Sequence, residues 1–165
     1  MTRVLALGLI PLLAGCVPDN RSPAISSVPP PSDPNPTKIV LSLSKMPVDS
    51  DANGYPDTLS VRIHLFEAEG GWPLSVAVPG SFRFELAPPR APAFATWNFD
   101  AAQTEAARGR DGAGPCYAFE LSLLSEGRTD RVDVESVDLR AVFTPAKHPD
   151  RPIRAPISMP FGRTR

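Results

Sequence analysis

The chain has 165 residues, 21 of them proline, and a formal net charge of −1 at pH 7. A near-neutral charge balance excludes the basic footprint of a nucleic-acid-binding protein, so we expect no nucleic-acid partner. The length is that of one domain with an ordinary hydrophobic core.

The N-terminus carries a short apolar stretch. Arg3 precedes a run from Val4 to Leu13, about half the length of roughly 20 residues that a helix needs to cross a bilayer. The sequence LAGC follows at positions 13–16. A positive residue, a short apolar run and a small-residue cleavage site are typical of an export signal. The segment resembles the type II signal peptide of bacterial lipoproteins, which ends in a lipobox of this kind.

This resemblance implies a signal peptide over residues 1–15 and a lipidated Cys16, with diacylglycerol on the thiol and an acyl chain such as palmitate on the amino group. Two or more acyl chains are enough for stable anchoring. The implied location is the cell envelope, with the membrane as partner through the N-terminal lipid. Val17 stands where an Asp would resemble an inner-membrane retention signal, so the resemblance favours the outer membrane.

Residues 16–36 comprise the cysteine and a Pro/Ser-rich segment that follows it. Prolines occur at positions 18, 23, 29, 30, 31, 34 and 36, and large apolar side chains are scarce. Such a composition buries too little surface to offset its ordering entropy, so it predicts a disordered or extended tether. At ~3.1 Å per residue, an extended segment of this length reaches on the order of 60 Å.

Residues 37–165 are expected to form one β domain, because apolar and polar residues alternate with a period of two. The predicted strands cover residues 38–43, 59–66, 74–78, 81–86, 117–124, 132–143 and 153–159. Val132 and Val134 have the opposite parity to Val137, which predicts a bulge near Glu135. Prolines at 152 and 156 restrict the last strand to a sheet edge.

One short helix interrupts the strands at residues 100–108. Asp100 is its candidate N-cap, Gln103 completes a capping box, and Gly109 is the expected terminator. We expect residues 97–99 to pack the helix onto a sheet and the glycine-rich residues 108–114 to form a flexible loop. The whole pattern predicts a mainly β protein: a single β-sandwich resembling the immunoglobulin or transthyretin architecture, with one connecting helix. The Cys–Trp–Cys core of true immunoglobulin domains is missing.

The segment from 49 to 57 has the composition of a metal-binding loop. Oxygen side chains of Asp49, Asp51, Asn53 and Asp57 stand at positions 1, 3, 5 and 9, with a glycine at position 6. This resembles the EF-hand-like calcium loops of thrombospondin type 3 and dockerin repeats, with Tyr55 supplying its backbone carbonyl. The resemblance makes calcium the candidate cofactor. Two departures are a serine at position 12 and a strand after the loop. The alternative is a plain turn, since Asn-Gly and Asp favour turn geometry without a cation.

Cys116 is the one cysteine left after Cys16, so no intrachain disulfide is expected. It precedes an alternating strand, which favours buried packing over a reactive role. No catalytic or zinc-binding motif is present, and neither His64 nor His148 belongs to one. The favoured function is a non-catalytic envelope module that binds a protein or a surface polymer. The alternative is an envelope hydrolase whose site is assembled from scattered histidine, serine and aspartate residues.

Overall fold

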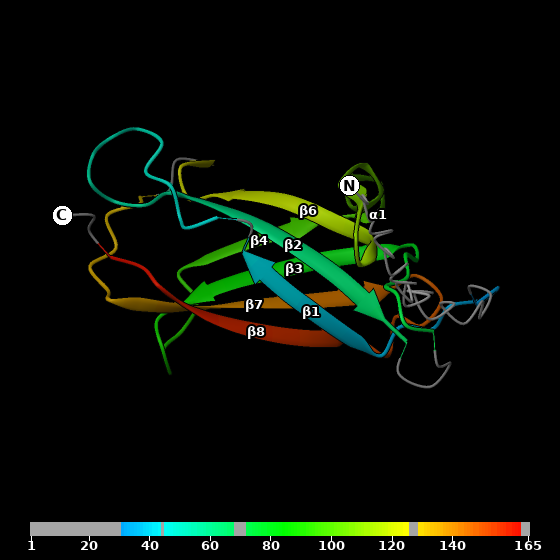
Figure 1. The fold of residues 1–165 in the computed structure, drawn as a ribbon. Helices are drawn as coiled ribbons and strands as arrows, with labels where there is room; N and C mark the ends of the chain where they lie inside the picture. Colours follow the sequence, from blue (N-terminus) through cyan, green and yellow to red (C-terminus); the bar gives the residue numbers. More distant parts are fainter. Residues whose placement is uncertain (1–30, 44, 68–71, 126–128, 163–165) are drawn as a thin grey trace, which may run out of the picture.

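The computed structural model describes residues 31–43, 45–67, 72–125 and 129–162. Within them the chain forms eight strands and one helix (Figure 1). In chain order these are β1 (Lys38–Leu43), β2 (Thr58–Phe66), β3 (Gly80–Ala87), β4 (Ala95–Phe99), α1 (Ala101–Ala106), β5 (Arg108–Asp111), β6 (Gly114–Ser122), β7 (Ser136–Pro145) and β8 (Ile153–Pro160).

The strands form two four-stranded antiparallel sheets that face each other. Sheet A has the order β1-β2-β6-β5, and sheet B has the order β4-β3-β7-β8. The two sheets meet where β1 lies against β8, and α1 crosses from β4 of sheet B to β5 of sheet A. The predicted mainly β sandwich with one connecting helix is therefore confirmed, and β8 is an edge strand as its prolines predict.

The core lies between the sheets because the central strands β2, β3, β6 and β7 turn alternate side chains inward. In β2 these are Val61, Ile63 and Leu65, each almost fully buried. Aromatic rings join the sheets. Phe82 of β3 lies 5.3 Å, centroid to centroid, from both Tyr117 and Phe119 of β6. Each such aromatic pair contributes about 0.5–1.5 kcal/mol beyond its buried area.

The helix begins as predicted and ends earlier. Asp100 Oδ1 accepts from the Gln103 N–H at 2.8 Å, and Gln103 Oε1 accepts from the Asp100 N–H at 2.9 Å, which completes the capping box. Gly109 is not the terminator, because α1 stops at Ala106 and the chain enters β5. The predicted flexible loop at 108–114 is wrong as well. Residues 108–111 instead form β5, because the edge of β6 is free to pair with them.

Three further expectations differ from the structure. Residues 74–78 form no strand, and Val76 makes only one isolated bridge to β2. The Tyr117 hydroxyl accepts a hydrogen bond from the Val78 N–H and donates one to the Val78 carbonyl. No bulge lies near Glu135, because β7 starts only at Ser136 and the preceding valines pack against the core from outside the strand. Residues 97–99, expected only to pack the helix onto a sheet, belong to β4, which spans Ala95–Phe99.

Candidate functional site

The predicted calcium loop lies at the end of the sandwich opposite residues 31–37 (Figure 1). Strand β1 begins at Lys38, directly after the tether, and runs to the segment that contains residues 49–57 (Figure 1). Carboxylate oxygens of Asp49, Asp51 and Asp57 lie within 4.8 Å of one another. The structure therefore brings together the three carboxylates of the predicted ligand set.

The loop carboxylates already accept hydrogen bonds from their own loop. Asp49 accepts from the Asn53 N–H at 3.1 Å and from the Gly54 N–H at 2.7 Å. Asn53 Oδ1 accepts from the Tyr55 N–H at 2.9 Å, so this predicted ligand oxygen also has a donor. Ala52 and Gly54 adopt the left-handed region, with φ of 60° and 91°. The turn interpretation accounts for these contacts without a cation, and calcium binding stays a prediction.

Asp57 is the buried member of the loop, with no exposed surface. It accepts hydrogen bonds from the Ser50 N–H at 2.7 Å, from the Ser50 hydroxyl at 2.8 Å and from the Thr58 hydroxyl at 2.5 Å. Burial alone would raise the pKa of Asp57, but the hydrogen bonds from Thr58 and Ser50 outweigh it and lower the pKa. The carboxylate is therefore ionised at neutral pH inside the protein.

A fourth carboxylate, Asp130, lies beside the loop and was missed by sequence reasoning. It is 4% exposed, and its Oδ2 accepts from Asn53 Nδ2 at 2.7 Å. The same amide group donates to Asp51 Oδ2 at 3.0 Å. Asp130 precedes β7, far from the loop in sequence, and no local pattern marks it. The contact adds negative charge to the surroundings of the predicted site.

A second cluster joins three different side chains on the outer face of sheet A. His64 of β2, Asp111 of β5 and Cys116 of β6 place a ring nitrogen, a carboxylate oxygen and the thiol sulfur within 4.8 Å of one another. His64 Nε2 lies 3.0 and 3.1 Å from the two Asp111 oxygens. Cys116 is buried, as predicted, but it lies beside a histidine that no sequence motif had linked to it.

Burial and the neighbouring Asp111 carboxylate favour the protonated form of the Cys116 thiol. Burial raises the pKa of Cys116, the Asp111 carboxylate raises it further, and the nearby Arg62 offsets only part of the effect. The hydrogen bond from His64 is the main cause that lowers the pKa of Asp111. Arg62 Nη1 lies 3.3 Å from Asp111 Oδ2, while its Nε is buried without a hydrogen-bond partner among the described residues.

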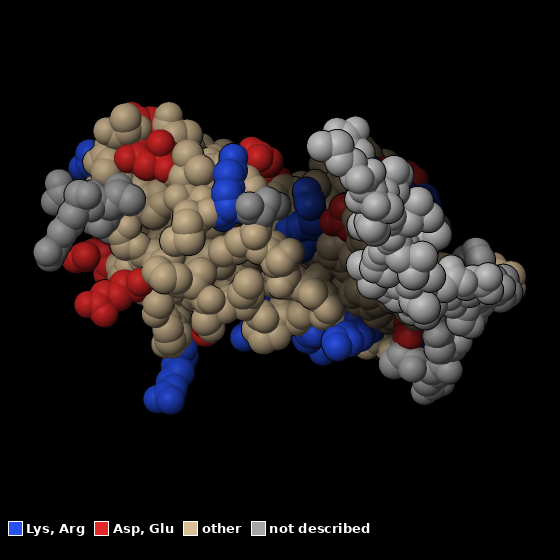
Figure 2. Space-filling model, viewed as in Figure 1, with Lys and Arg blue, Asp and Glu red and all other residues tan. Residues whose placement is uncertain are grey.

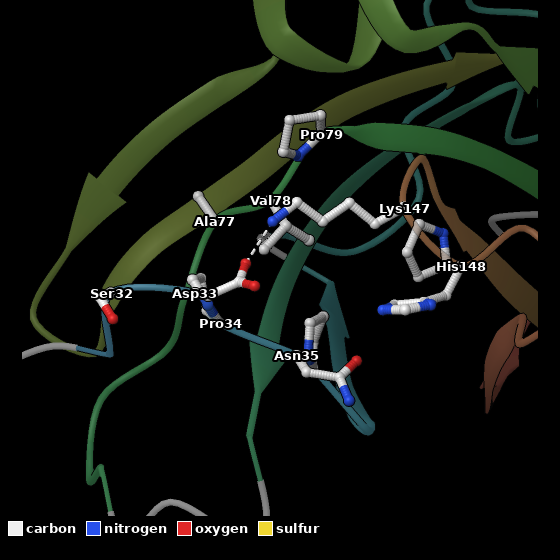
Figure 3. A pocket seen from close by; sticks show the side chains of 11 residues that line it. Ser32, Asp33, Pro34, Asn35, Ala77, Val78, Pro79, Lys147 and His148 are labelled. Carbon is white, nitrogen blue, oxygen red and sulfur yellow. Dashed lines mark hydrogen bonds and ion pairs between the residues drawn. The ribbon is translucent and has the colours of Figure 1, made fainter.

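A hollow of about 440 Å³ lies where the tether meets the domain (Figure 3). Figure 3 shows residues 32–35 along one side and Lys147 and His148 along another, with an ion pair between Lys147 and Asp33. Pro36 is buried, and the Thr37 N–H donates to the Phe66 carbonyl at 2.9 Å. The end of the predicted tether is thus held against the sandwich at Pro36 and Thr37.

The structure places His64 and His148 in different surroundings. Within the described ranges, no serine hydroxyl is hydrogen-bonded to His64 or His148. His148 is exposed and lines the tether hollow, whereas His64 is buried against Asp111. The buried Ser75 hydroxyl donates to the carbonyls of Ala113 and Pro115.

No model of a known protein family matches this chain, and no curated protein matches it. Among solved structures it is similar to MtrC from Shewanella baltica OS185, with 15% identity and a TM-score of 0.41. The similarity covers 76% of this chain and 22% of the MtrC chain, and so distant a likeness assigns no function. Cys16 and the signal segment lie outside the described residues. In the part of the chain that the structure describes, no helix has the length and apolar character to cross a membrane.

Proposed function

We propose that this chain is a lipid-anchored protein of the cell envelope, at the outer membrane, whose β-sandwich is a non-catalytic module for binding a protein or a surface polymer. The lipobox-like sequence at 13–16 supports the anchor. The main support for this layout is that Pro36 is buried and Thr37 is hydrogen-bonded to Phe66, so the end of the predicted tether lies against one end of the sandwich.

The two ends of the sandwich then have different surroundings. The tether end carries basic side chains: Lys147 pairs with the tether, and Arg151 and Arg154 line a neighbouring hollow with residues 35–37. Basic groups there suit the anionic headgroups of a membrane surface. The far end carries the acidic loop, and Figure 2 shows acidic side chains gathered on that side. The far end is thus the one offered to a partner.

The chemistry of the buried thiol supports a non-catalytic role over the hydrolase alternative. A nucleophilic cysteine needs a lowered pKa and access to its substrate. Cys116 has a raised pKa and is 4% exposed. His64 is 8% exposed, so neither side chain of the pair offers much surface to a bulky substrate.

Anchoring is tested by labelling cells with a palmitate analogue and separating membranes from soluble material. Cys16→Ser abolishes labelling and either releases the protein or leaves an unprocessed precursor. Cys116→Ser is the matched control, because it removes the other thiol and leaves label and membrane fractionation unchanged. Label retained in Cys16→Ser would overturn the anchoring proposal.

Binding at the far end is tested with a photo-crosslinking residue at Met46, which is 66% exposed and lies between β1 and the acidic loop. Ala146, exposed at the tether end, is the matched control position. We expect adducts in intact cells from position 46 and none from position 146. Equal yields from both positions, or none from either, would contradict a binding surface at the far end.

The proposed role of calcium is to stabilise the acidic loop. Three carboxylates with oxygens within 4.8 Å repel one another unless a cation shares them. At a tenfold excess over its dissociation constant, calcium would stabilise the fold by about 1.4 kcal/mol, which raises the melting temperature by roughly 4–6 °C. Asp51→Ala removes this shift, and the exposed Asp150→Ala retains it. Identical melting in calcium and in chelator would rule the site out.

A further inference from the structure

The cluster on the outer face of sheet A is built by strand register. In the antiparallel pairing of β2 with β6, Ile63 lies opposite Tyr117, and the next pair in that register is His64 with Cys116. Their inward-facing neighbours fill the core, so these two side chains lie on the other face. Asp111, at the end of β5, reaches the same place from the far side of Cys116. Three strands therefore hold three different ligand atoms together.

We propose that His64, Asp111 and Cys116 bind one divalent zinc ion, with a water molecule as its fourth ligand. Imidazole nitrogen, thiolate sulfur and carboxylate oxygen are the three donor types that zinc takes from proteins. Calcium and magnesium demand several oxygens instead, and the cluster offers them only one side chain. The donor set thus selects a different ion from the one that suits the acidic loop.

The spacing of the donor atoms is close to that of a tetrahedral site. Bond lengths of ~2.0–2.3 Å place neighbouring ligand atoms roughly 3.3–3.7 Å apart. The His64–Asp111 contact of 3.0 Å needs to open slightly, and the widest pair, at no more than 4.8 Å, needs to close. Gly109 lies opposite Cys116 in β5, and the nearest atom to a Cβ built there is the Cys116 sulfur, at 3.6 Å. The absent side chain leaves the sulfur room to shift.

Charge and access also fit a bound cation. Binding replaces the S–H bond of Cys116 with a zinc–sulfur bond, and the thiol proton passes to water. The resulting thiolate and the Asp111 carboxylate balance the two charges of zinc. The Arg62 guanidinium stays beside Asp111 as a hydrogen-bond partner at 3.3 Å. The Asp111 side chain is 26% exposed, which gives the ion and its water a route from solvent.

Cobalt(II) is the probe for this site, because it replaces zinc and reports its ligands by absorbance. The test uses the full chain with Cys16→Ser in mild detergent, so that Cys116 is the one thiol present. We expect one cobalt ion per chain, a sulfur-to-cobalt charge-transfer band, the intense visible bands of a tetrahedral site, and loss of all of them when zinc is added. Cobalt binding without a charge-transfer band would overturn the proposal. This outcome can be observed without substituting any of the three site residues.

Substitutions then assign the ligands. Cys116→Ser, His64→Gln and Asp111→Asn each weaken zinc binding by about 100-fold or more, because losing a ligand costs at least as much as losing an outer partner. The matched controls His148→Gln and Asp150→Asn bind zinc as the parent chain does. Far-UV circular dichroism verifies that each variant is folded. Unchanged affinity in folded Cys116→Ser would also overturn the proposal. The outcome of this zinc test does not depend on lipid anchoring, because Cys16 is replaced in every variant measured.

Discussion

The substitution Asp57→Asn tests whether a buried ionised carboxylate holds the acidic loop in place. The change keeps the size of the side chain but removes its charge and one acceptor oxygen. Hydrogen bonds to a charged group contribute about 1.5–3 kcal/mol each, and neutral ones about 0.5–1.5 kcal/mol. Ser50 and Thr58 provide three donors, and their two hydroxyl groups can rotate to accept from an amide. We therefore expect Asp57→Asn to lower the free energy of unfolding by about 1–3 kcal/mol at neutral pH.

The pH dependence of this loss identifies its cause. The pKa of Asp57 in the folded protein lies below its usual value of 3.8, so the carboxylate stabilises the fold fully above that value. The stabilisation disappears as the pH falls through the lower pKa of the folded state. Urea unfolding at pH 7 should thus separate parent and variant by the full amount, and the difference should shrink below about pH 4. Asp150→Asn, on an exposed residue, should stay within about 0.5 kcal/mol of the parent. An equal loss at pH 7 and at pH 3 would refute the argument.

Three further substitutions probe the contacts that hold the sandwich together, each measured by chemical unfolding. Tyr117→Phe removes the hydroxyl that bonds both backbone groups of Val78, and should cost about 1–3 kcal/mol with faster hydrogen exchange of the Val78 amide; unchanged exchange would disprove this clamp. Gly80→Ala places a Cβ 2.5 Å from the Phe143 ring and should cost at least about 1–3 kcal/mol, so a neutral result would contradict the close packing there. Trp97→Phe removes the 3.0 Å hydrogen bond from Trp97 Nε1 in sheet B to the Ser122 carbonyl of β6, and should lower the free energy of unfolding by about 1–3 kcal/mol. An unchanged free energy of unfolding would show that this bond does not stabilise the fold.

The strands that the sequence predicts well are those whose inward and outward residues differ most. β2 alternates Val61, Ile63 and Leu65 with polar residues, and its observed bounds differ from the predicted ones by a single residue at the start. The start of α1 was predictable for a local reason, since its capping box joins residues three apart. Both signals need only the chain segment itself.

The errors occurred where a partner strand decides the structure. Residues 108–111 contain a glycine and two arginines and have no apolar alternation, yet they pair with β6 because its edge is free at that point. Residues 74–78 alternate as a strand does, but Tyr117 satisfies the backbone of Val78 instead. Pairing of this kind depends on residues far away in the sequence.

The same distinction separates the two clusters of candidate ligands. The acidic loop was visible because its aspartates are neighbours in the chain. Asp130 joins it across 77 residues, and His64 meets Asp111 across 47, so neither contact has a local signature. Outward placement of His64 could be predicted from the alternation of β2. The register that puts Cys116 opposite it became available only with the sheet.

The junction between tether and sandwich also has a mechanical consequence. The predicted tether leads directly into β1, an edge strand whose six residues all pair with β2. A partner held at the far end would pull along the length of β1, while the hydrogen bonds of an antiparallel pair run across it. The load is then shared in shear by the whole β1–β2 ladder instead of opening it one bond at a time. If the chain is anchored as we propose, β1 is thus the strand placed to resist being peeled from the domain.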